Sequence, residues 1–176
     1  MRKRTLWLLI AISLPVSYST AVDAVECVYM SGEEQIALEG VRLGMLQGML
    51  DIAASQPTHI RHGWTPCDAC FEDKTPEEIC ELLNSGSIGF SLAINGELVQ
   101  PDWIAYYYGT PLRDVNTEDS WCVSWVFLFP AGYFDPGIYI LAGRWWANTD
   151  PQYSHCYCDL EPQDISVVLT LSVVAQ

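Results

Sequence analysis

Apolar residues alternate with other residues along several short runs of this 176-residue chain. A period of two residues is that of a β-strand with one buried face. The last run, DISVVLTLSVV, is the clearest, because every second side chain from Ile165 to Val173 is aliphatic. GIYILAGRWWA and SWCVSWVFLF predict two more strands, and the second of these is apolar on both faces, as in a central strand covered on both sides. Turns rich in Pro, Gly and Asp separate the runs, so we expect a mainly β, antiparallel sandwich.

The segment TPEEICELLNSG predicts one short α-helix at about residues 75–84. Thr75 can cap its N-terminus, Pro76 suits the first helical position, and Glu78 completes a capping box. Asn84 and the Ser-Gly pair after it end the helix. Its buried stripe is expected to consist of Ile79, Leu82 and Leu83.

Two further segments have local signals of β-structure. In GFSLAINGELVQ, Asn95-Gly96 supplies the positive φ angles that a two-residue hairpin turn requires. The segment SGEEQIALEGVRLGMLQGML could open a helix at Ser31, or form two short strands near residues 41–46 and 49–53. Its three spaced glycines would each cost a helix about 1 kcal/mol. We therefore favour strands, followed by another in PTHIRHGW.

The first 21 residues have the order of a secretory signal peptide. A basic start is followed by an apolar run from Leu6 to Val16 and then by small residues. The run is too short to span a bilayer. Its removal leaves five basic and 22 acidic residues, a net charge of −17, which disfavours nucleic acid and anionic lipid as partners. We expect a signal peptide at 1–21, an N-terminal extension at 22–47 and a sandwich domain at 48–176.

All cysteines lie beyond this leader, and export predicts that they form disulfides. An odd number leaves one cysteine that is either free or bonded between chains, and Cys122 is our candidate for it because it lies in an apolar run. Cys80, on the predicted helix, is near enough in the chain for Cys67 or Cys70 to bridge it. The disulfide candidates are Cys27, Cys67, Cys70, Cys80, Cys156 and Cys158.

The same cysteines allow two other interpretations. Cys67 and Cys70 together with Cys156 and Cys158 could supply four thiolates to zinc, with His59, His62 and His155 as further ligands. A thiol redox couple at Cys67 and Cys70 is disfavoured, because that motif normally opens a helix within a βαβ unit. The disulfide interpretation is preferred, so no metal or other cofactor is expected.

No catalytic motif occurs in the chain, which predicts that the protein is not an enzyme. A nucleophile elbow, a zinc-protease helix and a phosphate loop are all missing. His59 and His62 are three residues apart on a predicted strand and should point to opposite faces. Asp114, Asn116 and Glu118 partly imitate a calcium loop, but a solvated acidic turn explains them equally well.

Aromatic residues offer a possible binding surface. Trp145 and Trp146 are adjacent, so on a strand one ring must face away from the other. An exposed ring there, or in the group Tyr106, Tyr107 and Tyr108, could stack on a sugar or anchor a protein partner. The competing interpretation is that these rings fill the sandwich.

The stretch FDPGIYIL, residues 134–141, resembles a segment of immunoglobulin-like and fibronectin-III-like sandwiches. In those domains a corner tyrosine hydrogen-bonds to nearby backbone, and the resemblance implies that Tyr139 has this role. The order of IRHGW, helix, INGELV strand, Trp-rich strand and PAGYFDPGIY is similar to uncharacterised exported sandwich modules of prokaryotes. The antibody-type Cys…Trp…Cys spacing is missing, so that disulfide is not implied.

These observations predict an exported, disulfide-stabilised, immunoglobulin-like β-sandwich with one short helix and no catalytic activity. We expect a binding or structural role at or outside the cell envelope, with a glycan or another envelope protein as partner. A carbohydrate-binding module is the first alternative, and a metal or redox protein built on cysteines is the second.

Overall fold

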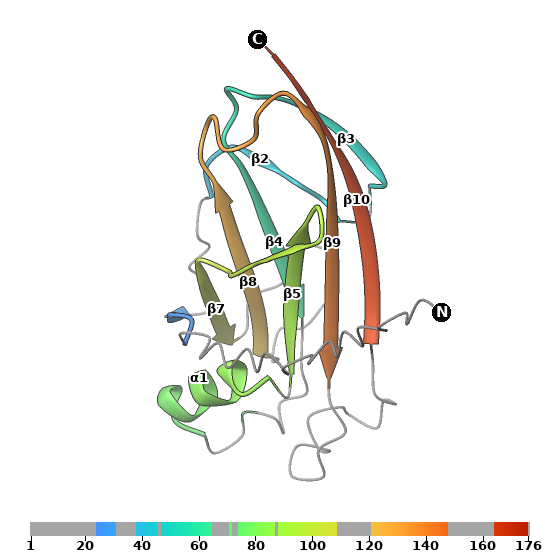
Figure 1. Cartoon of the computed structure of the whole chain (residues 1–176). Coiled ribbons are helices and arrows are strands. Elements are labelled where there is room, and N and C mark those ends of the chain that lie inside the picture. The colour runs from blue at the N-terminus through green and yellow to red at the C-terminus, as the bar shows by residue number, and fades with distance from the viewer. Residues whose placement is uncertain are drawn as a thin grey trace, which may run out of the picture.

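The computed structural model describes residues 24–30, 38–45, 47–64, 71, 74–86, 88–108, 121–147 and 164–175. These residues form ten strands and one helix (Figure 1). The helix is α1, Pro76–Asn84. The strands are β1 Cys27–Met30, β2 Val41–Arg42, β3 Met49–Ala53, β4 Thr58–Trp64, β5 Ile88–Ile94, β6 Glu97–Val99, β7 Trp103–Tyr108, β8 Trp121–Phe129, β9 Gly137–Ala147 and β10 Asp164–Val174.

The strands form two five-stranded sheets that pack face to face. The first sheet has the order β1-β7-β8-β4-β2 and the second β3-β10-β9-β5-β6. Helix α1 lies at one end of the sandwich (Figure 1). The predictions of a mainly β chain, of one short helix and of strands at 58–64, 121–129, 137–147 and 164–174 are confirmed.

The sheets are mixed, so the prediction of a purely antiparallel sandwich is wrong. β1 pairs with β7, β2 with β4 and β3 with β10 in parallel register. All three N-terminal strands occupy sheet edges. The pairings among β4 to β10 are antiparallel. The departure therefore arises because the N-terminal strands add to the edges of an antiparallel centre.

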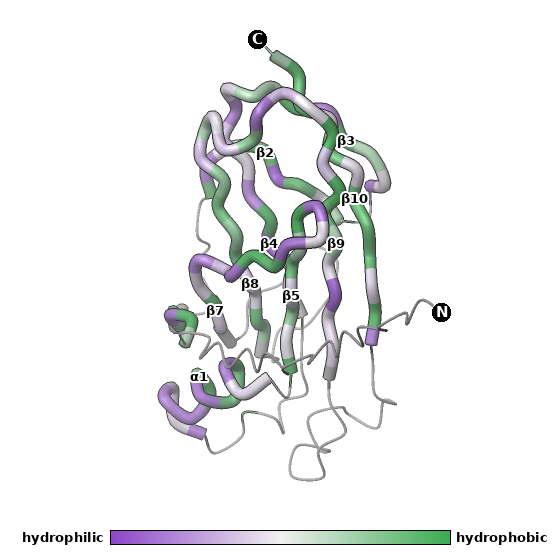
Figure 2. The backbone as a smooth tube through the Cα atoms, viewed as in Figure 1, coloured by the Kyte–Doolittle hydropathy of each residue, from purple (hydrophilic) through white to green (hydrophobic). Residues whose placement is uncertain are grey.

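The hydrophobic core lies between the two sheets. Phe127 of β8 contacts Phe90 of β5 edge-on, with ring centroids 5.8 Å apart. Leu169 and Leu171 of β10, in the second sheet, are also fully buried. Figure 2 shows apolar residues along these strands, whereas much of α1 is hydrophilic. Each large core side chain contributes about 1.5–3 kcal/mol by leaving water.

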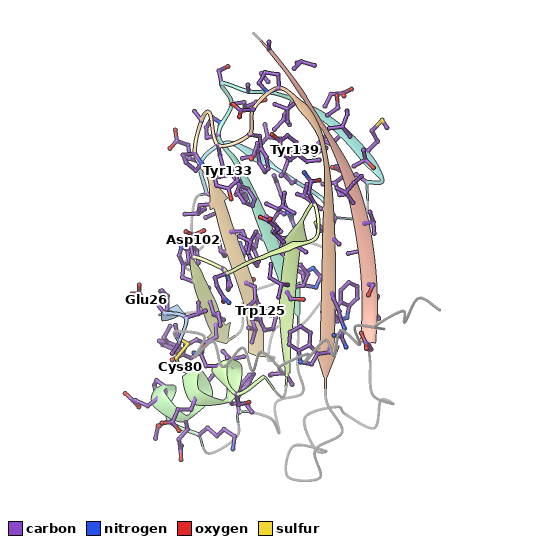
Figure 3. All side chains as sticks on the ribbon, viewed as in Figure 1. Glu26, Cys80, Asp102, Trp125, Tyr133 and Tyr139 are labelled. Carbon is purple, nitrogen blue, oxygen red and sulfur yellow. A yellow bond between two sulfur atoms is a disulfide. The ribbon has the colours of Figure 1, made fainter. Side chains whose placement is uncertain are left out.

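β8 is the central strand of the first sheet and is buried on both faces, as its sequence predicts. Val123, Trp125 and Phe127 point into the core, and Trp125 is marked in Figure 3. On the other face, Cys122 and Ser124 are also fully buried. Cys122 lies there outside the Cys27–Cys80 disulfide.

Helix α1 has the predicted N-terminal capping box. The Thr75 hydroxyl accepts a hydrogen bond from the Glu78 N–H at 3.3 Å, and the Glu78 carboxylate accepts one from the Thr75 N–H at 2.7 Å. Pro76 occupies the first turn. The predicted stripe of Ile79, Leu82 and Leu83 is buried. The helix thus packs against the sandwich with one face and leaves its acidic first turn to solvent.

A disulfide joins α1 to the N-terminal strand. Cys80 is bonded to Cys27 of β1, and their Cα atoms are 5.7 Å apart. The prediction that Cys67 or Cys70 bridges Cys80 is wrong, because the helix face that carries Cys80 lies against β1. Asn84 strengthens the same junction by accepting a hydrogen bond from the Val25 N–H at 2.9 Å and donating one to the Val25 carbonyl at 3.1 Å.

The predicted hairpin and the predicted tyrosine hydrogen bond are both present. Asn95 and Gly96 have φ angles of 51° and 88° and connect β5 to β6. Asn95 also accepts a hydrogen bond from the Ile140 N–H through its side chain, at 2.9 Å. The Tyr139 hydroxyl donates to the Asp135 carbonyl at 3.1 Å. Tyr139 lies at the end of the sandwich opposite Cys80 (Figure 3).

Several predicted features lie outside the described residues. They are the signal peptide at 1–21, the acidic turn at 114–118, His155 and the cysteines Cys67, Cys70, Cys156 and Cys158. The segment 22–47 contributes β1 and β2 to the first sheet. The described part of the chain has no helix that is long and apolar enough to cross a membrane.

Candidate functional site

The predicted aromatic residues lie in three different environments. Tyr106 is buried, and its hydroxyl donates to the Pro76 carbonyl at 3.2 Å. Tyr107 and Tyr108 belong to β7, but their side chains lie outside the described part. Trp145 points toward the first sheet, where it stacks on His62 with ring centroids 4.7 Å apart. Trp146 points the other way, as expected for neighbours on a strand.

Trp146 covers part of the outer face of the second sheet. Its indole lies directly over Gly89 of β5, the residue opposite it in register. A Cβ atom at Gly89 would come within 2.7 Å of the indole Cζ2 atom, so a side chain there would force the ring away. The indole Nε1 donates to the Gly86 carbonyl at 2.8 Å. One ring face and one ring edge are therefore held by the protein.

Arg144 and Asp164 continue this surface, and the Arg144 guanidinium lies over the indole ring. The Arg144 guanidinium donates two hydrogen bonds to the Asp164 carboxylate, each of 2.8 Å. Its central carbon is 5.6 Å from the centroid of Trp146. Both charged side chains are more than half exposed. The hydrogen bond from Arg144 lowers the pKa of Asp164, so the pair stays ionised at neutral pH.

The pairing of β9 with β5 and β10 places two serine hydroxyl groups next to Arg144 and Asp164. Ser91 of β5 and Ser166 of β10 flank Arg144 on the neighbouring strands. In the following, the Trp146 surface means Ser91, Arg144, Trp146, Asp164 and Ser166. It combines one aromatic ring with donors and acceptors of both charges.

A cavity of about 180 Å³ lies between the sheets near the other tryptophan. We call it the His62 cavity. It is lined by Arg42, Leu43, Gly44, Met45, Gln47, Arg61, His62, Trp145 and Val167. It opens between β2 and β4 of the first sheet and β9 and β10 of the second, and is bordered by the turn that follows β2.

His62 forms one wall of this cavity. Its imidazole stacks on Phe90, with centroids 4.3 Å apart and ring planes 16° apart, as well as on Trp145. Burial, and then the positive charge of Arg42, lower the pKa of His62 to about 4. The ring is consequently neutral at pH 7, with one nitrogen as donor and the other as acceptor.

The two histidines of β4 face opposite ways, as their spacing predicts. His59 lies on the outer face, where its Nδ1 is 3.1 Å from the Glu39 carbonyl oxygen. Nothing in the sequence connects His62 with Arg42 and Gln47, which come from a short strand and a turn. The only local signal was the adjacent Arg61-His62 pair.

The described residues offer no arrangement typical of metal catalysis. No group of three or more His, Cys, Asp or Glu residues is close enough within them to hold a metal ion. Comparison with protein families, with curated proteins and with solved structures finds no match to this chain. The candidate sites are therefore interpreted from their own geometry.

Proposed function

We propose that this protein is an exported, non-catalytic β-sandwich module that binds a glycan through the Trp146 surface. The observation that carries the proposal is the position of the indole, which lies against the sheet at Gly89. A ring supported in this way loses little conformational freedom when a ligand stacks on it.

The chemistry of the surface suits a sugar. The C–H-rich face of a pyranose stacks on an aromatic ring, and its hydroxyl groups both donate and accept hydrogen bonds. Arg144 offers donors and Asp164 offers acceptors within reach of the same ring. Ser91 and Ser166 add hydroxyl groups on either side.

Export is supported by two features. The leader has the order of a signal peptide. The Cys27–Cys80 disulfide fits an oxidising compartment outside the cytosol. We further propose that the sandwich is immunoglobulin-like, on the basis of the Tyr139 hydrogen bond, although the parallel edge strands depart from a purely antiparallel sandwich.

The test is a glycan array probed with the mature protein and with three variants. Trp146→Ala should abolish binding, and Gly89→Ala should weaken it about tenfold or more, because the added Cβ displaces an intact indole. Tyr133→Ala removes a half-exposed aromatic ring elsewhere on the sandwich and should leave binding unchanged. Circular dichroism of each variant shows whether it is folded.

Two results would count against the proposal. The first is no binding by the folded wild-type protein across a broad array that includes acidic and neutral glycans. The second is a positive array signal that survives Trp146→Ala, because the ligand would then bind elsewhere.

A further inference from the structure

Arg42, an exposed residue that lines the His62 cavity, carries a positive charge that no acidic residue of the described chain neutralises. Arg42 donates to the Arg61 carbonyl oxygen at 3.3 Å, and it forms no ion pair with any described carboxylate. This contrasts with Arg144, which donates two hydrogen bonds to the Asp164 carboxylate. The chain has 22 acidic and only eight basic residues, so an arginine without a carboxylate stands out against its overall charge.

His62 adds a neutral polar group to the same wall. Stacking on Phe90 and Trp145 fixes the plane of the imidazole. Among the described residues, no hydrogen bond reaches either of its nitrogens. Among the described residues, Thr58 Oγ1 is the one polar side-chain atom that is fully buried and has no hydrogen-bond partner. The unbonded nitrogens of His62 are therefore not fully buried. A ring nitrogen of His62 is thus available to a molecule in the cavity.

The remaining walls are mostly apolar. Leu43 and Met45 are buried core residues that close one side, and Val167 and the Trp145 ring close the other. Gln47, an exposed residue in the turn after β2, contributes an amide. Bare phosphate or sulfate would be poorly matched to such walls, because an apolar surface cannot replace its hydration.

The volume limits the size of the occupant. An apolar cavity of roughly 150 Å³ in another protein holds a benzene molecule, and the His62 cavity has about 180 Å³. A single six-membered ring with one small substituent fits this space, whereas a nucleotide or a disaccharide does not.

We propose that the His62 cavity binds a small carboxylate whose body is a single six-membered ring. The carboxylate lies against Arg42, the ring lies between Trp145 and the aliphatic walls, and His62 and Gln47 provide further hydrogen bonds. The site is separate from the Trp146 surface, because Trp145 and Trp146 project from opposite faces of β9.

The test uses matched probes that differ in charge. Benzoate and cyclohexanecarboxylate are titrated against the mature protein by isothermal calorimetry, together with the uncharged amides benzamide and cyclohexanecarboxamide. At least one acid should bind about tenfold or more tightly than its own amide, since a charge-assisted hydrogen bond is roughly twice as strong as a neutral one. The proposal would be overturned if each acid bound with the same affinity as its own amide, or if none of the four compounds bound.

Variants then locate the binding. Arg42→Gln should remove the preference for the acid, while Arg144→Gln deletes an equal charge on the outer face and should leave it unchanged. Val167→Phe fills the cavity and should abolish binding of both acids. If Arg42→Gln reduces stability, thermal melts of that variant reveal the loss. Val167→Phe then still shows whether the acids bind in the His62 cavity. Loss of acid binding in Arg144→Gln but not in Arg42→Gln would contradict the proposal.

The two proposals can fail separately. Trp146→Ala should leave binding of the acids unchanged, and Val167→Phe should leave the glycan array unchanged.

Discussion

At the residue scale, neighbouring side chains of one strand have different environments. Trp145 lines a cavity between the sheets, and Trp146 lies on the outer face over Gly89. The alternation of a β-strand predicts this division. It cannot predict that Gly89 lies opposite Trp146, because that depends on the register between β5 and β9.

The neutral state of His62 predicts a pH dependence of stability. Its pKa is lowered from 6.5 to about 4 in the folded protein. The unfolded chain therefore binds more protons between these values, and stability falls as the pH drops from 6.5 toward 4. The loss is at most about 3 kcal/mol and is reduced by the water that reaches the half-buried ring.

Urea unfolding of wild type and His62→Phe at several pH values isolates this contribution. The two proteins share every other titrating group. Their difference in unfolding free energy should be constant above pH 7 and should change in favour of His62→Phe by about 2–3 kcal/mol at pH 4. A difference that does not vary with pH would show that the histidine keeps its ordinary pKa.

The candidate sites show which residues a single sequence can reveal. Trp146 was predictable, because paired tryptophans on a strand must diverge. Arg42 and Gln47 were not, because they reach His62 only when a two-residue strand packs at the edge of β4. Such a contact depends on tertiary packing and leaves no periodic pattern in the sequence.

At the element scale, local signals predicted the central strands, and they also favoured strands near 41–46 and 49–53, where β2 and β3 lie at sheet edges. They predicted neither β1 nor the parallel pairing of the N-terminal strands. The hairpin at Asn95-Gly96 and the caps of α1 are set by residues close together in sequence, and both are present. β1 and β2 have four and two residues, too few for a periodic pattern. Their parallel pairing depends on tertiary packing, since β1 pairs with β7 far along the chain and β2 pairs with β4 across an intervening strand, so local patterns predicted an antiparallel sandwich.

The capping box of α1 can be tested by removing one hydroxyl. Thr75→Ala leaves the Glu78 N–H without its acceptor and should lower the free energy of unfolding by about 1 kcal/mol. Thr75→Ser keeps the hydroxyl and should remain within about 0.5 kcal/mol of wild type. Urea denaturation measures both. Equal losses in the two variants would mean that the threonine methyl group, and not the cap, stabilises the helix.

At the scale of the whole molecule, the Cys27–Cys80 disulfide closes a large loop. It connects β1 at the edge of the first sheet to α1, across a sequence separation of 53 residues that includes β2, β3 and β4. Export predicted disulfides in general, but the pairing could not be read from spacing, because Cys67 and Cys70 are closer to Cys80 in the chain.

Removing this bond should destabilise the protein substantially. For a loop of this length, chain entropy in the unfolded state predicts a loss of about 4 kcal/mol in the variant with Cys27→Ala and Cys80→Ala. Calorimetry of the variant and of the oxidised wild type measures the difference. Peptide mapping without reduction should also find the two cysteines in one linked fragment, and a fragment linking Cys80 to Cys67 or Cys70 would contradict the assignment.

The same covalent junction determines how the module would respond to mechanical force. A pull applied at the N-terminus reaches Cys27 and passes through the sulfur atoms into α1, so the segment between the two cysteines cannot be stretched. Only the chain beyond Cys80 would lengthen when the sandwich ruptures, and reduction of the bond would release the hidden length. A module anchored by its N-terminus would therefore keep β2, β3 and β4 within a closed loop under load.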